Sequence, residues 1–434
     1  MPTQSGTSVE ATRIPFAKTE IPPEAVAAAA QVLASGWVTS GPEVVQFEHE
    51  FAAHLGADHA VAVSSCTTAI ELALRALGLA QGARVLTPTN TFCGAVHAIV
   101  HAGLEPVLVD CDAETLAPNA STTAAAAERA GGVDAMVVLH FAGYPASVEE
   151  LAAAAGLPLT RVIEDAAHGL GTLVGGAEGT SERSVGTISK ATCFSFYATK
   201  NLPIGEGGMV TTSDPALADF VRRARLHGMS RDAWKRYLPG NGWRYAVETA
   251  GLKANMTDVQ AAIGRAQLRR LEVYQARRAA LADRYERNLT RVPGIRPAAR
   301  PASGRHAWHL YVIQVEPDFG IARDVLVERL AERGVDCSVH FIPLHHQPYF
   351  RALLGGRTDN FPVADAAFER IVSLPLYPSL SDHSVDQVCE AIADLRHPTS
   401  YSGNARRSTD QQFPLVQGDA GEVGARTGAV RQAN

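Results

Sequence analysis

Short apolar segments recur through the first half of the chain. Most are apolar throughout rather than alternating with polar residues, which is typical of strands that helices cover on both faces. The segments are Val61–Ser65, Arg84–Pro88, Pro106–Asp110, Ala135–Phe141, Val162–Asp165, Thr192–Tyr197 and Met209–Thr212. Helical patterns separate several of them; within 68–79, for example, Ile70, Leu74 and Leu77 fall on one helical face. This alternation predicts an α/β fold with a mainly parallel sheet flanked by helices.

The pattern changes after about residue 256. Thr257 and Gln260 have the spacing of a capping box, so we predict that an arginine-rich helix over Asp258–Leu289 begins there. An aromatic, strand-like segment at Trp308–Val315 and a helix near Arg323–Arg333 follow at irregular spacing.

These changes divide the chain into three parts. We expect a large domain over residues 13–256 and a smaller C-terminal α+β domain over residues 257–396, which includes the long helix. Residues 397–434 contain five glycines but a single leucine and a single phenylalanine. We therefore expect this last part to form a disordered tail.

Composition narrows the class of protein. The chain has 434 residues and a net charge of -6, which offers nucleic acid no general attraction, and we expect no nucleic-acid partner. Its six cysteines follow neither a zinc-binding nor a disulfide pattern, so reduced thiols are expected. The sequence shows neither the layout of a signal peptide nor an apolar stretch suited to a membrane span. We expect a cytoplasmic protein without a membrane partner.

Lysine is scarce in this chain, with five lysines against 34 arginines, and one of them is unusually placed. Lys200 follows the apolar segment that ends at Tyr197 and precedes a glycine-rich turn. A partly desolvated lysine has a lowered pKa and exposes the neutral amine that adds to carbonyl groups. Lys190 precedes the same segment and is interpreted as a solvated surface charge.

A second candidate group lies in the segment VIEDAAHGLGT, residues 162–172. Asp165 ends a predicted strand, where carboxylates commonly face the ligand crevice of a parallel sheet. A buried carboxylate needs a cationic partner, and a protonated pyridine ring would serve. The alternative is that Asp165 caps the next helix. His168 could flank the same ring or could be an ordinary core histidine.

Hydroxyl groups mark a third candidate site. Four of the five residues from Ser64 to Thr68 carry a hydroxyl, and they lie between a predicted strand and a predicted helix. A helix N-terminus with free amides and hydroxyls binds phosphate. Thr68 and Glu71 also match a capping box, and both roles are compatible if Thr67 faces the phosphate while Thr68 caps the helix.

A lysine amine, a strand-end aspartate and a phosphate cup are together what pyridoxal phosphate requires. Here the sequence resembles the DegT/DnrJ/StrS family of sugar aminotransferases, which are fold-type-I, pyridoxal-phosphate-dependent enzymes. The resemblance covers about residues 14–395. Its motifs are SGWVTSGPEVVQFE, SSCTTA, TPTNTFCGAVHAI, EDAAHGLGT, FSFYATKNLPIGEGGM, RLHG, LKANMTDVQAAIGRAQL, VHFIPLHHQPYF and LPLYP.

The resemblance implies roles for individual residues. Lys200 matches the catalytic lysine that carries the cofactor and moves protons, and Asp165 matches the acid paired with the ring nitrogen. The other residues implied to bind the cofactor are Thr67, Thr68, Phe92, His168, Ser195 and Asn255, of which Asn255 would reach the phosphate of the neighbouring subunit. Ser40, His227 and His340 are implied to contact substrate.

Two positions depart from the usual pattern of the family. Residue 168 is histidine where many members have glutamine, and GLKANM replaces a GYNYR-like stretch, which removes an aromatic residue and an arginine.

The implied activity is transfer of an amino group from an amino acid, expected to be glutamate, to a keto group of a nucleotide-linked keto-deoxysugar. A homodimer with shared active sites is also implied. Three alternatives stay open: a keto-cyclitol aminotransferase of the aminoglycoside type, a pyridoxal-phosphate-dependent sugar dehydratase, and a non-catalytic regulatory protein. Lys200 argues against the dehydratases, which carry histidine at this position.

One further pair of residues invites a metal-binding interpretation. His345 and His346 are adjacent, but no carboxylate or cysteine accompanies them at ligand spacing in the sequence. We therefore interpret them as loop or substrate-pocket histidines and expect no metal.

Overall fold

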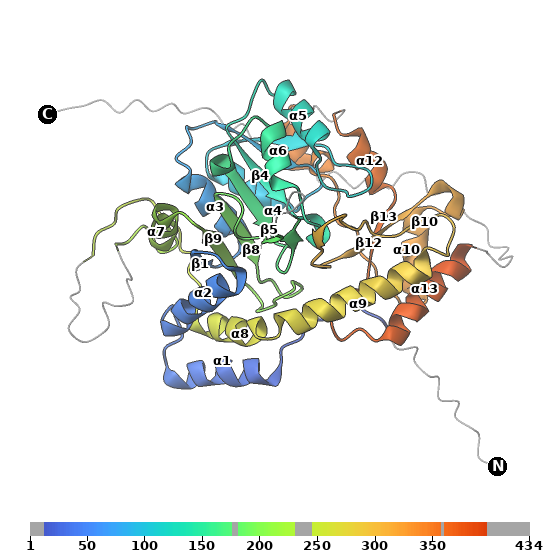
Figure 1. Ribbon diagram of the computed structural model, residues 1–434, viewed down its shortest axis with the longest axis horizontal. Coiled ribbons are helices and arrows are strands. Elements are labelled where there is room, and N and C mark those ends of the chain that lie inside the picture. The colour runs from blue at the N-terminus through green and yellow to red at the C-terminus, as the bar shows by residue number, and fades with distance from the viewer. Residues whose placement is uncertain (1–12, 176–180, 231–244, 357–359, 397–434) are drawn as a thin grey trace, which may run out of the picture. The chain divides into compact units, whose positions relative to one another are not determined.

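A seven-stranded sheet forms the centre of the computed structural model, which describes residues 13–175, 181–230, 245–356 and 360–396 (Figure 1). The predicted tail, 397–434, lies outside the described residues. The strands of this sheet are β1 (His59–Val63), β2 (Arg84–Pro88), β3 (Glu105–Val109), β4 (Ala135–Leu139), β5 (Val162–Ala166), β8 (Ala191–Ser195) and β9 (Gly208–Thr212). Their order is β1-β9-β8-β5-β4-β2-β3. β9 pairs antiparallel with β1 and β8, and the other neighbours pair parallel.

Helices cover both faces of this sheet, which explains why its strands are mostly apolar. On one face lie α3 (Cys66–Ala76), α4 (Cys93–His101) and α7 (Pro215–Ala224), and on the other lie α2 (Pro42–Leu55), α5 (Ala120–Arg129) and α6 (Val148–Ala154). In β1, Val61 and Val63 join the core around α3, whereas Ala60 and Ala62 join the core around α2. The predicted α/β fold with a mainly parallel, helix-flanked sheet is confirmed.

A second, antiparallel sheet forms the C-terminal part of the fold, with β12 (Tyr311–Val315) between β10 (Ile295–Arg296) and β13 (Ile371–Leu374). It shares one apolar core with α9 (Leu271–Leu289), α10 (Arg323–Glu332) and α13 (Asp382–Arg396). The first described residues also belong to this core, because Ile14 is buried in it and pairs with Val335.

Shorter elements complete the described chain. A small sheet consists of β6 (Leu173–Val174), β7 (Arg183–Ser184) and β11 (Gly304–Arg305). The remaining helices are α1 (Pro23–Ser35), α8 (Asp258–Leu268), α11 (Pro348–Leu353) and α12 (Pro362–Phe368), with short 3-10 turns η1 (Phe141–Gly143), η2 (Leu159–Arg161), η4 (Pro317–Phe319) and η5 (Leu344–His346). No helix in the described part of the chain is both long and apolar enough to cross a bilayer.

The predicted long helix over 258–289 is two helices, so this prediction was wrong in its length. The capping box is present, because the Thr257 side chain accepts from the Gln260 amide and Gln260 bonds back to the Thr257 amide. The helix then breaks at Arg269 and Arg270, where the Arg270 amide bonds to the Gln267 carbonyl three residues back.

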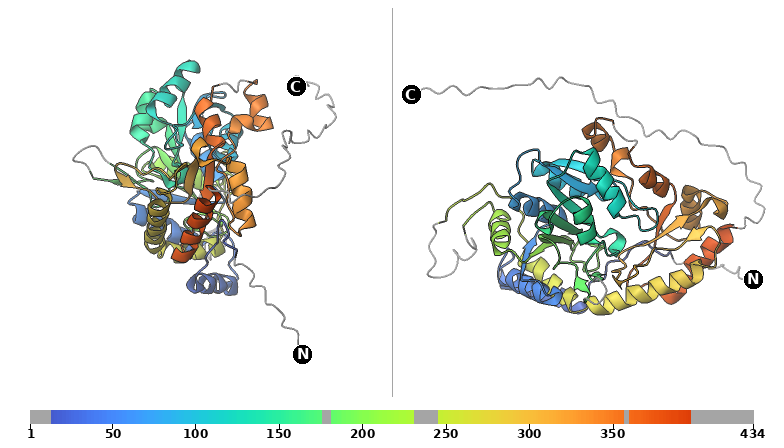
Figure 2. Two further views of the ribbon diagram at one scale, coloured as in Figure 1. Left: turned by 90° about the vertical axis from the view of Figure 1, so that its right-hand side faces the viewer. Right: turned by 45° about the horizontal axis from the view of Figure 1, so that its top comes forward.

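The two helices pack in different places. α8 packs against α1 and α2, whereas α9 runs along α13 (Figures 1 and 2). The break therefore lets the chain pass from the core of the large sheet to the core of the small sheet. The division into domains at residue 256 stays a prediction.

Candidate active site

A cavity of about 600 Å³ lies where the carboxyl ends of β5 and β8 meet the beginnings of α3 and α4. Segments from the C-terminal part, including Val339–Phe341, close another side. Crevices at the carboxyl ends of parallel strands are the usual ligand sites of α/β sheets. Seven of the residues predicted from the sequence line this cavity: Thr67, Phe92, Asp165, His168, Ser195, Lys200 and His340.

Lys200 lies in the turn after β8, where its own amide bonds to the Tyr197 carbonyl at 2.9 Å. Burial lowers the pKa of its amine to about 8, although the charges of Asp165 and Cys66 oppose the shift. The ammonium makes no hydrogen bond within the described residues. At pH 7, about a tenth of this amine is therefore uncharged and nucleophilic, far more than for a solvated lysine.

Asp165 lies in β5, and only one oxygen of its carboxylate has hydrogen-bond partners among the described residues. Oδ1 accepts the Ala167 amide at 3.0 Å and lies 3.6 Å from the Cys66 thiol, which donates to it. Burial raises the pKa of Asp165, against the opposing effects of the Ala167 amide and the Lys200 charge. Among the described residues Oδ2 has no hydrogen-bond partner, so the carboxylate offers one free oxygen for a protonated ring nitrogen.

His168 has a defined hydrogen-bonding state. Its Nδ1 accepts the backbone amide of Ala142 at 3.2 Å, so a neutral ring carries its proton on Nε2. Burial lowers the pKa of His168 well below its usual value, and the nearby positive charge of Lys200 adds to the shift. The ring stacks on Phe341 with an interplanar angle of 16°. His168 is thus a neutral donor, the same capacity that a glutamine amide has at this position.

The start of α3 provides hydroxyls and amides to the cavity. Ser65 caps this helix by accepting the Thr68 amide, so the predicted cap at Thr68 was wrong. The reason is that the cap lies three residues earlier than expected. Glu71 pairs with Arg75 instead of closing a capping box. Thr67 points into the cavity beside Gly94, where a Cβ would lie 2.5 Å from Thr67 Oγ1. A side chain at this position would therefore displace the Thr67 hydroxyl.

His340 lies on the side of the cavity formed by the C-terminal part. Its Nδ1 shares a hydrogen bond with Ser373 Oγ at 2.9 Å, and its ring stacks on Phe16. Burial lowers the pKa of His340 to about 4, with a further contribution from the positive charge of Lys200. At neutral pH the ring is uncharged, so it binds polar groups by hydrogen bonding.

Four of the predicted residues do not line this cavity. Thr68 Oγ1 instead bonds to Ser65 Oγ at 2.8 Å. Asn255 donates to Ser40 Oγ at 2.7 Å, and the His227 amide bonds to the Leu252 carbonyl at 2.9 Å. Ser40, His227 and Asn255 therefore lie outside the cavity lining, and Ser40 and Asn255 contact each other.

Sequence reasoning missed several lining residues. His309, Phe341, Cys66 and Glu206 all contribute to the cavity. His309 lies 4.4 Å from the His168 ring, and Asn201 holds it through Nδ1 at 3.2 Å. Cys66 and Glu206 stand within motifs already noted, SSCTTA and IGEGG, whereas nothing in the sequence near His309 indicates that it reaches the site.

Lys190 and the adjacent histidines His345 and His346 were not predicted to bind the cofactor or a metal. Lys190 forms an ion pair with Asp214 at the surface, consistent with its interpretation as a structural charge. His345 and His346 do not line the cavity, and the structure brings Asp365 to both of them.

Comparisons with known proteins agree with this geometry. The sequence matches the DegT/DnrJ/EryC1/StrS aminotransferase family over residues 19–393. It is 44% identical over 384 residues to the spore coat polysaccharide biosynthesis protein SpsC of Bacillus subtilis (strain 168), covering 88% of this chain and 97% of SpsC.

Two solved structures share the fold. Spr1654 from Streptococcus pneumoniae, in its pyridoxamine phosphate form, has a TM-score of 0.79 and 29% identity, covering 88% of this chain and 99% of that chain. It is also known in a pyridoxal phosphate form. The sugar aminotransferase CalS13 from Micromonospora echinospora has a TM-score of 0.75 and 26% identity, covering 88% of this chain and 99% of that chain.

Fold and comparisons together define a fold-type-I aminotransferase that uses pyridoxal phosphate. The chain belongs to the DegT/DnrJ/EryC1/StrS aminotransferase family. The resemblance seen in the sequence, the enzyme class and the cofactor are thereby confirmed, and the interpretation as a non-catalytic protein falls.

Proposed function

We propose that this enzyme transfers an amino group from glutamate to the keto carbon of a nucleotide-linked keto-deoxysugar in the cytoplasm. The observation that carries the proposal is the juxtaposition in one cavity of the half-buried Lys200, the carboxylate of Asp165 and the hydroxyl-rich start of α3. Pyridoxal phosphate, when bound, supplies a carbonyl that combines with amines and a ring that delocalises electrons.

Each residue has a proposed part in holding the cofactor. Thr67 and Ser195, with the free amides at the start of α3, bind the phosphate. Phe92 is 62% exposed at the start of α4 and is free to cover one face of a ring. Asp165 Oδ2 would accept a hydrogen bond from the protonated ring nitrogen, and His168 Nε2–H would donate to the ring oxygen.

Lys200 is the proposed catalytic residue. Its amine would hold the carbonyl carbon of the cofactor, and as a free base it would take the proton from Cα of the amino-acid donor. The pKa of about 8 suits this step, because a base works best when its pKa lies near the operating pH. Asp165 keeps a negative charge beside the ring nitrogen and so favours its protonated state.

The sugar substrate is supported by two observations. Relatives include a polysaccharide biosynthesis protein and a sugar aminotransferase. In addition, the uncharged rings of His340 and His309 give the cavity polar, uncharged contacts. Sugar hydroxyls need such partners, because an unpaired buried hydroxyl is costly.

A homodimer with shared active sites is part of the proposal. Ser40, His227 and Asn255 match family residues that contact substrate or phosphate, but they lie outside the cavity of their own subunit. This placement is expected if they complete the cavity of a neighbouring subunit. His227 is exposed and free to make such a contact.

The reverse half-reaction tests the substrate class. Nucleotide-linked amino sugars should convert the pyridoxal form of the enzyme to the pyridoxamine form, which is followed by absorbance. Free amino-cyclitols are the comparison. If these react while every nucleotide-linked amino sugar tried is inert, the enzyme is a keto-cyclitol aminotransferase instead.

A further inference from the structure

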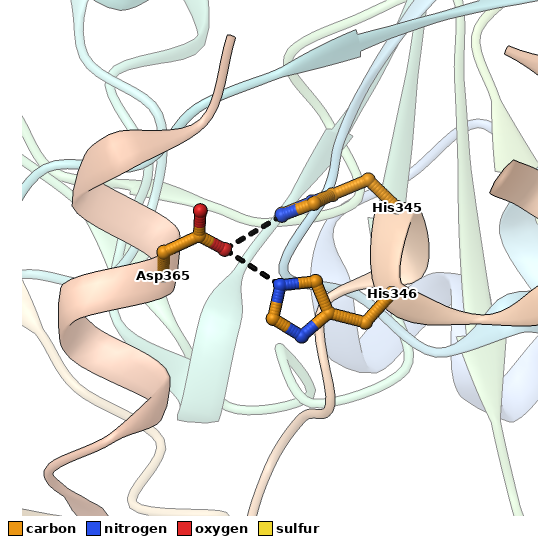
Figure 3. A group of neighbouring side chains, drawn as sticks. All are labelled: His345, His346 and Asp365. Carbon is orange, nitrogen blue, oxygen red and sulfur yellow. Dashed lines mark hydrogen bonds and ion pairs between the residues drawn. The ribbon is translucent and has the colours of Figure 1, made fainter. Parts of the chain in front are cut away.

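A histidine–aspartate cluster lies outside the active-site cavity, formed by His345, His346 and Asp365 (Figure 3). The two histidines stand on the turn η5, and Asp365 comes from α12, 19 and 20 residues further along the chain. Both imidazole Nε2 atoms point at the same carboxylate oxygen, Oδ1, at 2.7 Å each. The three ligand atoms lie within 4.8 Å of one another.

The surroundings hold this cluster in place. The ring of His345 is fully buried, stacks on Phe361 at 4.5 Å and meets Thr89 Oγ1 through Nδ1 at 2.7 Å. Thr89 thus bonds to the far nitrogen, as the outer partner of a metal-binding histidine commonly does. The Leu344 amide, bonded to the Thr89 carbonyl at 2.9 Å, anchors the turn to the same residue.

The position of Asp365 is fixed by the start of α12. The Asp110 carboxylate at the end of β3 accepts the amides of Val363 and Ala364 at 3.1 and 2.8 Å. This long-range cap orients the helix and compensates the positive end of its dipole, which would otherwise disfavour a cation beside Asp365.

The cluster is also open on one side. The side chains of Asp365 and His346 are 43% and 33% exposed, so solvent reaches both of these side chains. No donor from the described residues reaches Asp365 Oδ2. Two imidazoles, one carboxylate and an open position are the ligand set of a tetrahedral zinc site that binds water as its fourth ligand.

We propose that His345, His346 and Asp365 bind a divalent transition-metal ion, Zn²⁺ by ligand type, which ties η5 to α12. An ion at about 2.0–2.1 Å from each nitrogen requires the ligand atoms to separate slightly from hydrogen-bond distance. His346 and Asp365 are partly exposed and have the freedom to do so. Because Phe341 and Phe92 line the active-site cavity a few residues from His345 and Thr89, the ion also braces one wall of that cavity.

Metal titration of the untagged, full-length enzyme with its cofactor tests the proposal. After chelator treatment and desalting, one equivalent of Co²⁺ should bind per chain, with visible bands of tetrahedral coordination and without the charge-transfer bands of thiolate ligands. Zn²⁺ should displace it and raise the thermal unfolding midpoint, whereas Mg²⁺ should do neither.

Variants separate the cluster from other histidines. Asp365→Asn and His346→Ala should each weaken Co²⁺ binding by at least about tenfold, and the exposed His383→Ala should bind as the wild type does. His346→Ala leaves the His345–Asp365 bond in place, so it remains informative if Asp365→Asn fails to fold. Absence of stoichiometric binding, or equal affinity in His346→Ala and wild type, would show that Asp365 is only a shared hydrogen-bond acceptor.

Discussion

At the scale of single residues, the burial of Lys200 beside Asp165 determines the pKa of the Lys200 amine. Burial disfavours the ammonium, and the Asp165 carboxylate only partly restores it. The fraction of neutral amine therefore falls below pH 8 by about tenfold for each unit of pH. A solvated lysine would lose its neutral form two to three units higher, roughly at its ordinary pKa.

This difference predicts how pH affects cofactor capture. The rate at which cofactor-free enzyme takes up pyridoxal phosphate should rise with pH and level off above about 8. Stopped-flow absorbance measures it. In Asp165→Asn the midpoint should move down, because the carboxylate that raises the pKa of Lys200 is gone. A wild-type midpoint near 10 would mean that Lys200 is solvated.

Asp165→Asn should also slow turnover. The substitution keeps the shape of the side chain but removes the charge that favours a protonated ring, a charge-assisted bond of about 1.5–3 kcal/mol. We expect turnover to fall by roughly ten- to a hundredfold. Asp336→Asn is the control, because that carboxylate pairs with Arg13 away from the cavity. Equal turnover in the two variants would remove Asp165 from the mechanism.

At the scale of elements, the start of α3 gives two neighbouring threonines different contacts. Thr67 lines the cavity, whereas Thr68 bonds to Ser65 within the first turn. Thr67→Ala should weaken cofactor binding by roughly ten- to a hundredfold, because a hydrogen bond to a charged group is lost. Thr68→Ala should bind almost normally. Fluorescence titration compares them, and equal losses would make Thr68 a phosphate ligand as well.

The strand and helix pattern could be predicted because it is local. Strands buried on both faces are mostly apolar. Asp165 lies near the end of such a strand, and Lys200 and His168 follow one within a few residues. The break at Arg269 and Arg270 could not be predicted, because neither glycine nor proline marks it and packing on different cores causes it.

Contacts between elements far apart in the sequence could not be predicted either. Asp365 meets His345 and His346 from α12, whose first turn Asp110 caps from the end of β3. His309 reaches the cavity after Trp308, which has a left-handed backbone with φ of 47°. The start of α3 was misplaced because Ser65 and Thr68 are both capping residues, and the spacing of Thr68 to Glu71 favoured the wrong one.

At the scale of the whole molecule, the shared-site dimer predicts complementation. Lys200→Ala and Asn255→Ala each damage every site of their own homodimer. If Asn255 completes the neighbouring subunit's site, a mixed dimer contains one site with both residues intact. Unfolding and refolding the two variants together should therefore restore part of the activity. No recovery, in mixtures that chromatography shows to contain mixed dimers, would place Asn255 in its own subunit's site or outside any site.

The central claim is that Lys200 carries the cofactor, and reduction with borohydride followed by peptide mapping tests it most directly. The purified enzyme should be yellow, and reduction should attach the cofactor to the peptide containing Lys200. Lys200→Ala should keep affinity for pyridoxal phosphate through the phosphate contacts but yield no labelled peptide and no turnover. Label on Lys190 or Lys253, with Lys200 unmodified, would contradict the account.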